Sequence, residues 1–268
     1  MIYMHIFKAF LIAFSMYSRI PVPQRFIEWN DKNMKYSICF FPLVGAVIGL
    51  LLVLWYKLCG LLGFGEILFA AVAASVPVFV TGGIHLDGFC DTTDALASYQ
   101  PTERKLEILK DPNAGAFAVI KTCVYVLLYF AFLTHASYAA VLVLSVGFVL
   151  SRALSGLAVI NFRSAKGSGL AASFAEKAHK RAVTVTLVIY VLLCAAAMVF
   201  LSGIFSAAAA LCMAALCAAA AVFIYYRIMA YRQFGGITGD IAGYFLSLCE
   251  IWMCVSVVIM EGVLKIWN

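Results

Sequence analysis

The sequence predicts an all-α integral membrane protein, with about seven transmembrane helices and a short N-terminal half-helix. Of its 268 residues, 65% are hydrophobic and 12% are charged, and the mean hydropathy is +1.01. Soluble domains carry roughly 25% charged residues, so this chain has too few to cover a water-facing surface. Several apolar runs also approach the ~20 residues with which a helix crosses a bilayer. We therefore expect the lipid bilayer to surround a single polytopic domain made of residues 1–268.

The apolar runs give the predicted elements in chain order. Residues 5–18 are apolar but only about 14 residues long, against the ~20 needed for a span, so they are expected to form an interfacial or re-entrant helix. The first full span carries Gly45 and Gly49, whose spacing favours close contact with a neighbouring helix. The charged run 103–111 is typical of a solvated amphipathic helix. The seven predicted spans are residues 36–56, 66–84, 117–133, 139–162, 183–201, 206–227 and 241–264.

Loop charge predicts the orientation. Seven spans place four loops on one side, and we call these the four basic loops: residues 19–35, 85–116, 163–182 and 227–240. They hold 14 of the 19 lysines and arginines. Because cytoplasmic loops are enriched in Lys and Arg, this side is predicted to face the cytoplasm, across the inner (cytoplasmic) cell membrane. The nine cysteines form an odd count without a Cys-x-x-Cys pair, so neither disulfides nor a zinc site are predicted.

A cluster of carboxylates follows the second predicted span. Residues 81–94 have the sequence Thr-Gly-Gly-Ile-His-Leu-Asp-Gly-Phe-Cys-Asp-Thr-Thr-Asp. On a helix, Asp87, Asp91 and Asp94 would lie at positions i, i+4 and i+7, within an arc of roughly 60°. Three carboxylates on one face suit Mg²⁺, which takes hard oxygen ligands together with water and substrate phosphates. The alternative is a solvated helix N-terminus whose acidic residues complement the helix dipole.

A second acidic site, Asp240, lies just before the last span. Gly235, Gly239 and Gly243 repeat at every fourth residue around it. On one helix face, these glycines would let a neighbouring helix or a substrate approach the backbone closely. Helix packing alone is the simpler explanation of the glycines, but it does not account for Asp240.

Two charged residues lie deep inside predicted spans. Glu250 stands about ten residues into the last span, roughly 15 Å deep at 1.5 Å per residue. Arg152 lies at a similar distance from the cytoplasmic end of its own span. An unpaired charge at that depth costs several kcal/mol, so such residues usually pair or line a wet cavity. We expect Arg152 and Glu250 either to pair directly or to share a substrate cavity.

Four further polar residues are candidates, each with a structural alternative. His85 could be a general base, a hydrogen-bond donor to a phosphate, or a metal ligand. Alternatively, it could be a structural histidine that is hydrogen-bonded to a carbonyl. Asp111, just before Pro112, could be a fourth acidic contributor or only a helix-end residue. Arg163 and Lys166, beside a Gly-Ser-Gly loop, could bind an anion through side chains and loop N–H groups. A cytoplasmic loop would carry basic residues in any case.

These motifs resemble the cobalamin synthase family, the adenosylcobinamide-GDP ribazoletransferases. Its pattern contains Arg-Ile-Pro-Val-Pro, Phe-Pro-Leu-Val-Gly, Thr-Gly-Gly-x-His-Leu-Asp-Gly-x-x-Asp-Thr-x-Asp, Glu-Ile-Met-(Lys/Arg)-Asp and Gly-Gly-x-Thr-Gly-Asp. The matching segments are residues 19–23, 41–45, 81–94, 107–111 and 235–240, with Glu250 in register. The sequence departs from the pattern at Pro112-Asn113, where the family usually has Ser-Arg, and at Ala95, where a Gly is common. Neither departure removes a carboxylate.

The resemblance implies the last assembly step of the cobalamin nucleotide loop. A hydroxyl of α-ribazole, or of α-ribazole 5′-phosphate, attacks the cobinamide-side phosphorus of adenosylcobinamide-GDP, and GMP leaves. The family is described as Mg²⁺-dependent and membrane-embedded, which implies a glycophosphotransferase with Mg²⁺ as cofactor. The implied partners are the two small-molecule substrates and the lipid bilayer, with no nucleic acid. Assembly as a homo-oligomer stays open.

On this basis we assign roles to the candidate residues as a hypothesis. Asp87, Asp91 and Asp94 bind Mg²⁺. Asp240 is a further ligand or accepts the proton of the attacking hydroxyl. His85 assists as a base or as a hydrogen-bond donor to a phosphate. The candidate substrate-binding residues are Asp111, Arg152, Arg163, Lys166 and Glu250.

Two other functions fit parts of the sequence. The Asp-x-x-x-Asp-x-x-Asp spacing is also similar to CDP-alcohol phosphotransferases, which would release CMP rather than GMP, but that likeness covers only this motif. A membrane transporter would use Arg152 and Glu250 as a coupling pair and the glycines as hinges of a broken helix. Against a transporter, the carboxylates concentrate at one face of the membrane, and no inverted repeat is found.

Overall fold

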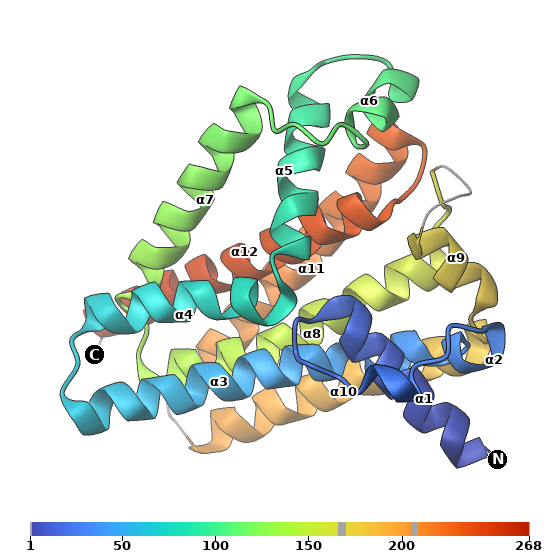
Figure 1. Cartoon of the computed structure of the whole chain (residues 1–268). Coiled ribbons are helices and arrows are strands. Elements are labelled where there is room, and N and C mark those ends of the chain that lie inside the picture. Colours follow the sequence, from blue (N-terminus) through green and yellow to red (C-terminus); the bar gives the residue numbers. More distant parts are fainter. Residues whose placement is uncertain (1, 166–169, 205–207, 268) are drawn as a thin grey trace.

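The fold is helical throughout the described part of the chain, residues 2–165, 170–204 and 208–267 of a computed structural model (Figure 1). One isolated backbone bridge, Ser164 to Ile237, is the nearest approach to a β-structure in these residues. The elements are α1 (Ile2–Tyr17), η1 (Gln24–Phe26), α2 (Asp31–Met34), η2 (Ser37–Phe40), α3 (Phe41–Leu62), α4 (Glu66–Thr81), α5 (Ile84–Ala97), α6 (Thr102–Ile108), α7 (Ala116–Leu133), α8 (Tyr138–Asn161), α9 (Leu170–Lys177), α10 (Lys180–Ile204), α11 (Ala208–Phe234) and α12 (Gly239–Trp267).

The predicted class, an all-α multi-pass membrane protein, is confirmed. Among the described residues six helical segments are long and apolar enough to cross a bilayer, and the bent pair α4–α5 makes a seventh if it counts as one span. α7 and α10 bury only 17% and 22% of their most apolar windows inside the protein. Their remaining apolar side chains face outward, where lipid would surround them. α1 has 16 residues and, as expected, is shorter than the six candidate spans.

The span predicted at residues 66–84 is helical as far as Thr81, and a sharp bend replaces its last three residues. α4 ends at Thr81, and α5 begins at Ile84 after a bend of 93°. Gly82 and Gly83 make the turn with φ values of 67° and 83°, a left-handed conformation that glycine adopts without steric cost. The bend turns α5 away from α4 and lays it against α12 (Figure 1). The acidic stretch is therefore held on a packed helix rather than in a loop.

The long helices pack into one assembly around α8 and α12. α3, α8 and α10 lie side by side, while α11 pairs with α12 and α5 crosses α12 (Figure 1). The close contact predicted for Gly45 and Gly49 is confirmed, because both face the backbone of α8 at Phe148 and Ser145. With no side chain between them, α3 and α8 approach closely.

The four basic loops meet at one end of the molecule, as the topology predicts. Hydrogen bonds join the first loop to the third, the third to the fourth, and the second to the end of α11. These bonds run from His179 N to Lys35 O (3.2 Å), from Ile237 N to Arg163 O (2.9 Å) and from Lys105 Nζ to Gln233 Oε1. The two acidic sites consequently share this end of the protein.

One local prediction is wrong. Gly235 does not share a helix face with Gly239 and Gly243, because it has a φ of 72° in the turn between α11 and α12. The third basic loop contains a helix, α9, which the sequence reasoning did not predict. The amphipathic helix expected in the run 103–111 is present as α6, with most of its charged side chains exposed and Lys105 buried against the end of α11.

Candidate active site

The first acidic cluster lies on one face of α5. The stretch is helical from Ile84 to Ala97, so the conditional expectation for Asp87, Asp91 and Asp94 is met. Asp87 is exposed at the first turn, whereas Asp91 and Asp94 are partly withdrawn from solvent. The carboxylates of Asp87 and Asp91 accept no hydrogen bond from any described residue, which leaves their oxygens available to a ligand.

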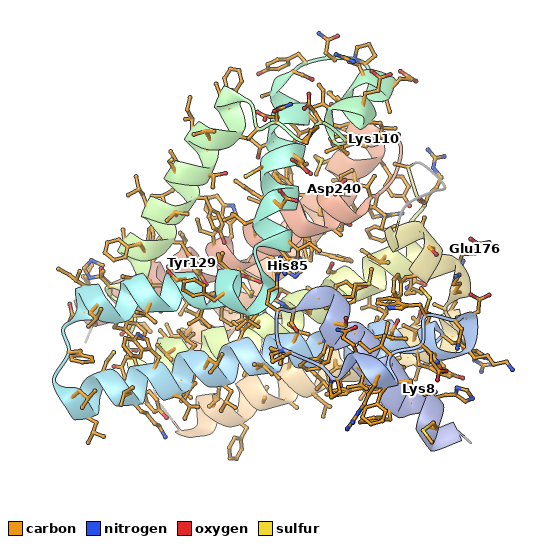
Figure 2. The ribbon with its side chains drawn as sticks, in the orientation of Figure 1. Lys8, His85, Lys110, Tyr129, Glu176 and Asp240 are labelled. Carbon is orange, nitrogen blue, oxygen red and sulfur yellow. The ribbon has the colours of Figure 1, made fainter. Side chains whose placement is uncertain are left out.

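A backbone-to-backbone crossing brings the second acidic site to the first. A Cβ atom added to Gly88 of α5 would stand 2.5 Å from the carbonyl oxygen of Asp240. A Cβ added to Gly243 of α12 would stand 3.0 Å from the carbonyl oxygen of His85. Only glycine fits at such a crossing. Asp240, in the first turn of α12, is therefore fixed beside the acidic face of α5, close to His85 (Figure 2).

The carboxylates of Asp87, Asp91, Asp94 and Asp240 are close enough to interact electrostatically. The charges of Asp87, Asp240 and Asp94 all act on the partly buried carboxyl group of Asp91. Such a cluster of like charges is unfavourable unless a proton or a cation lies among them. As the side chains stand, no three His, Cys, Asp or Glu groups in the described residues are close enough together to hold a metal ion. A cation bound here would thus require one or more of these side chains to reorient.

Asp94 differs from Asp87 and Asp91 because both of its carboxylate oxygens accept hydrogen bonds. Its Oδ1 accepts the backbone N–H of Ala118 (2.8 Å), and its Oδ2 accepts that of Gly115. These are unsatisfied N–H groups at the start of α7. A carboxylate there also complements the positive end of the helix dipole. Asp94 therefore joins α5 to α7 as well as contributing charge to the cluster.

A cavity of about 370 Å³ opens beside the acidic residues. Its polar lining includes His85, Asp87 and Asp240, together with Lys110 from the segment after α6. The rest is largely apolar and comes from α1, η2, α3, α8 and α12. The volume is within the roughly 300–1,000 Å³ typical of small-molecule sites.

His85 separates this cavity from a smaller chamber of about 40 Å³ behind it, because it lines both. In Figure 2, it lies between Tyr129, which lines the chamber, and Asp240, which lines the large cavity. The His85 ring contacts Phe41 edge-on at 5.8 Å, and its carbonyl accepts the Ser247 hydroxyl (3.3 Å). His85 Nε2 is buried without a hydrogen-bond partner among the described residues. The chamber is large enough for a water molecule that could satisfy this nitrogen.

The predicted association of Arg152 with Glu250 is confirmed as a direct ion pair. Arg152 Nη1 donates to Glu250 Oε1, and the two side chains are 1% and 6% exposed. Arg152 also donates to the Ser151 hydroxyl at 3.0 Å. Both ionic residues line the 40 Å³ chamber rather than the large cavity, so neither is placed to touch a substrate held in that cavity. Their role in substrate binding stays a prediction.

The structure draws attention to Lys110 rather than its neighbour Asp111. Asp111 is exposed and outside the cavity lining, and its carboxylate accepts the backbone and side-chain N–H groups of Asn113, both at 2.9 Å. These bonds hold the pKa of Asp111 below its ordinary value. Lys110 lines the cavity with Asp87 and Asp240, and it has no carboxylate partner among the described residues (Figure 2).

Arg19 is a second cation that the sequence reasoning missed. Its side chain crosses Gly82, where an added Cβ would stand 2.5 Å from Arg19 Nε. Arg19 also lines, with Asp87, a second hollow of about 670 Å³ beside α5. Its place in the Arg-Ile-Pro-Val-Pro segment was the available signal, but the contact with Gly82 depends on the α4–α5 bend.

Of the two remaining basic candidates, Arg163 does not line the cavity. Arg163 is exposed, its Nε donates to Gly235 O (2.8 Å), and its backbone N–H donates to the Tyr231 hydroxyl (2.9 Å). Arg163 thereby holds the third basic loop on the turn between α11 and α12. Lys166 lies outside the described residues. Anion binding by these two residues stays a prediction.

Comparisons with known proteins agree with the motifs. A sequence model of the family described as "Cobalamin-5-phosphate synthase" matches residues 9–258. The chain is 50% identical over 257 residues to an adenosylcobinamide-GDP ribazoletransferase of Lachnoclostridium phytofermentans, covering 94% of each chain. Relatives of the same name from Clostridium perfringens and Treponema denticola are each 36% identical, with 91% of this chain and 94% and 95% of theirs aligned. No solved structure matches the chain.

Proposed function

This chain belongs to the cobalamin-5-phosphate synthase family, and we infer from that membership that it completes the nucleotide loop of cobalamin. It transfers the adenosylcobinamide-phosphate group of adenosylcobinamide-GDP to α-ribazole or α-ribazole 5′-phosphate. The products are adenosylcobalamin or its 5′-phosphate, together with GMP. We place the reaction where α5 crosses α12, because that crossing brings Asp87 and Asp240 together beside the 370 Å³ cavity. This is the single observation on which the location rests.

The reaction needs charge neutralisation and alignment more than covalent help from the protein. A new bond forms between the attacking hydroxyl oxygen and the cobinamide-side phosphorus, and the bond from that phosphorus to the GMP oxygen breaks. The hydroxyl proton must pass to a base, and negative charge develops on the leaving phosphate. Positioning and electrostatic stabilisation are the main sources of rate enhancement in such transfers.

The carboxylate cluster fits Mg²⁺ as the neutralising ion. The donors are hard oxygen atoms, which Mg²⁺ prefers, and the mutual repulsion around Asp91 would be relieved by a cation. We propose that Asp87, Asp91 and Asp240 hold the ion, because both oxygens of Asp94 accept backbone N–H groups at the start of α7, whereas Asp87 and Asp240 line the cavity and Asp91 interacts electrostatically with both of them. When bound, Mg²⁺ would neutralise the diphosphate and stabilise charge on the transferring group.

The other cavity residues have roles that follow from their positions. Asp240 and His85 both line the cavity, so either is placed to accept the proton of the attacking hydroxyl. Lys110 offers an unpaired ammonium group beside Asp87 and Asp240, which suits binding of a substrate phosphate oxygen. Because the four basic loops share this end, we propose that the site faces the cytoplasm from the inner membrane.

GMP release by the full chain, purified in detergent, tests this function. With adenosylcobinamide-GDP, α-ribazole and Mg²⁺, we expect GMP and a cobalamin product in equal amounts. Chelation of Mg²⁺ is expected to lower the rate by at least about 10²-fold, since charge stabilisation at the transferring group would be lost. A chain that releases no GMP, or that releases CMP from a CDP-alcohol instead, would contradict the proposal.

A further inference from the structure

We propose that the 370 Å³ cavity is the α-ribazole site, with the benzimidazole base in its apolar part and the ribose directed toward the carboxylates. The assignment rests on the proposed function and goes further, because it says which substrate enters the protein and which remains outside. Three features carry it: the division of the lining, the volume, and the hydrogen-bonding character of the apolar part.

The lining divides by element into a polar and an apolar part. Asp87, Lys110 and Asp240 come from the start of α5, the segment after α6 and the start of α12. The apolar part comes mainly from α1, η2, α3 and α8. It includes the aromatic rings of Tyr17 and Phe41, whose centroids are 4.3 Å apart. A planar, apolar base would pack against such rings. A nucleoside with an apolar base and a polar sugar matches this division.

The volume separates the two substrates. A benzimidazole ribonucleoside is a compact molecule suited to the lower end of the roughly 300–1,000 Å³ range of small-molecule pockets. Adenosylcobinamide-GDP carries a corrin macrocycle, an adenosyl group and a guanine nucleotide, so it is several times larger than a cavity of about 370 Å³. The whole of the larger substrate therefore does not fit into this cavity. Asp87 also lines the second hollow, so its carboxylate is accessible from both sides.

The apolar part also favours a benzimidazole over guanine, the other base in the reaction. Once attached to ribose, a benzimidazole has no N–H donor and one ring nitrogen acceptor. Guanine would bring several donors and acceptors, each of which is costly to bury without a partner. One hydroxyl is present on the α8 side of the cavity, that of Ser155, which is 1% exposed and has no hydrogen bond to any described residue. That hydroxyl could donate to the single ring nitrogen.

With the base held there, the ribose hydroxyls reach toward the acidic crossing. The attacking oxygen would meet a phosphorus atom presented from outside, and its proton would pass to Asp240 or His85 as the bond to GMP breaks. An in-line displacement requires the attacking ribose oxygen and the leaving GMP oxygen to lie on opposite sides of the phosphorus. Approach of the ribose from the cavity, and of adenosylcobinamide-GDP from outside it, is compatible with that geometry.

The substitution Val159→Phe tests the assignment by filling the cavity. Val159 is a half-buried α8 residue of the apolar lining. We expect Val159→Phe to raise the KM for α-ribazole by about 10- to 100-fold, the scale on which small volume changes in an apolar pocket act. The KM for adenosylcobinamide-GDP should change by less than about threefold, because that substrate does not enter. The matched control is Val149→Phe, a half-buried α8 residue that lines neither the cavity nor the chamber.

A series of bases distinguishes lost space from general damage. Val159→Phe should discriminate against the 5,6-dimethylbenzimidazole riboside more strongly than against the unsubstituted benzimidazole riboside, and Val159→Ala should shift the preference the other way. A rise in KM confined to adenosylcobinamide-GDP, or no dependence on base size in either variant, would overturn the cavity assignment while GMP release by the unmodified chain kept the proposed function intact. Absence of GMP release from the unmodified chain would overturn both.

Discussion

Replacing Asp91 with Asn is expected to lower the rate of GMP release about 10³-fold, as happens when one preorganised charge-stabilising group is removed from an active site. Asp91 is the member of the cluster on which Asp87, Asp94 and Asp240 all act. Asparagine keeps the size of the side chain but removes the charge that a Mg²⁺ ion would balance. The fold should survive, because the Asp91 carboxylate makes no hydrogen bond within the described residues. Initial rates in detergent, at saturating concentrations of both substrates, measure the effect.

The control for Asp91 is the same substitution at Asp31. Asp31 lies in α2 at the same end of the molecule, with a side chain that is 78% exposed and pairs with Lys177. Asp31→Asn should leave the rate of GMP release within about twofold, because exposed ion pairs contribute little. Near-normal turnover by Asp91→Asn, with an unchanged dependence on Mg²⁺, would contradict the metal role of the cluster.

The substitution Arg152→Met is expected to lower the free energy of unfolding by about 3–5 kcal/mol, because it leaves the carboxylate of Glu250 buried without a partner. Besides the ion pair, the substitution removes the hydrogen bond from Arg152 to Ser151. It also removes the cation–π contact in which the Arg152 guanidinium carbon lies 5.4 Å from the ring centroid of Phe148. Adding Glu250→Leu should recover most of the loss, since an apolar pair avoids the uncompensated charge. Denaturant or thermal unfolding in detergent measures both variants.

The control for the buried pair is the exposed one between Arg104 and Glu107, whose side chains are 63% and 62% exposed. Arg104→Met should cost less than about 1 kcal/mol. If Arg152→Met costs no more than Arg104→Met, the pair does not stabilise the fold. If the double variant is as unstable as the single one, packing around Arg152 rather than its charge is what matters.

The sequence predicts the fold well because the bilayer makes each span a local property of the chain. A run of apolar residues becomes a helix wherever it must satisfy its own backbone in lipid. Hydropathy does not predict the bend between α4 and α5. Hydropathy continues through Thr81, and the pair of glycines permits a turn without requiring one. The crossing of α5 with α12 then fixes the bend, and that contact joins residues far apart in the sequence.

The site is predicted less completely than the fold, because several of its contacts join residues far apart in the sequence. The acidic spacing on α5 and its closeness to Asp240 could be inferred, because helix periodicity and loop topology are regular. The double hydrogen bonding of Asp94 could not, because its partners lie 21 and 24 residues further along the chain. Nor could the position of Lys110: in the turn that follows α6 its side chain lines the cavity, while that of the next residue, Asp111, is exposed and outside the lining. The sequence alone does not indicate which of two neighbours in a turn faces the cavity.

The central claim is that Asp87, Asp91 and Asp240 together bind the cation that supports phosphoryl transfer. The most direct measurement is Mn²⁺ binding to the full chain in detergent, followed by electron paramagnetic resonance. We expect the unmodified chain to bind Mn²⁺ in competition with Mg²⁺. Asp91→Asn should weaken binding by more than the about 10- to 100-fold that substitutions outside the metal ligands cause. Equal Mn²⁺ affinity in Asp91→Asn and in the unmodified chain would contradict the claim.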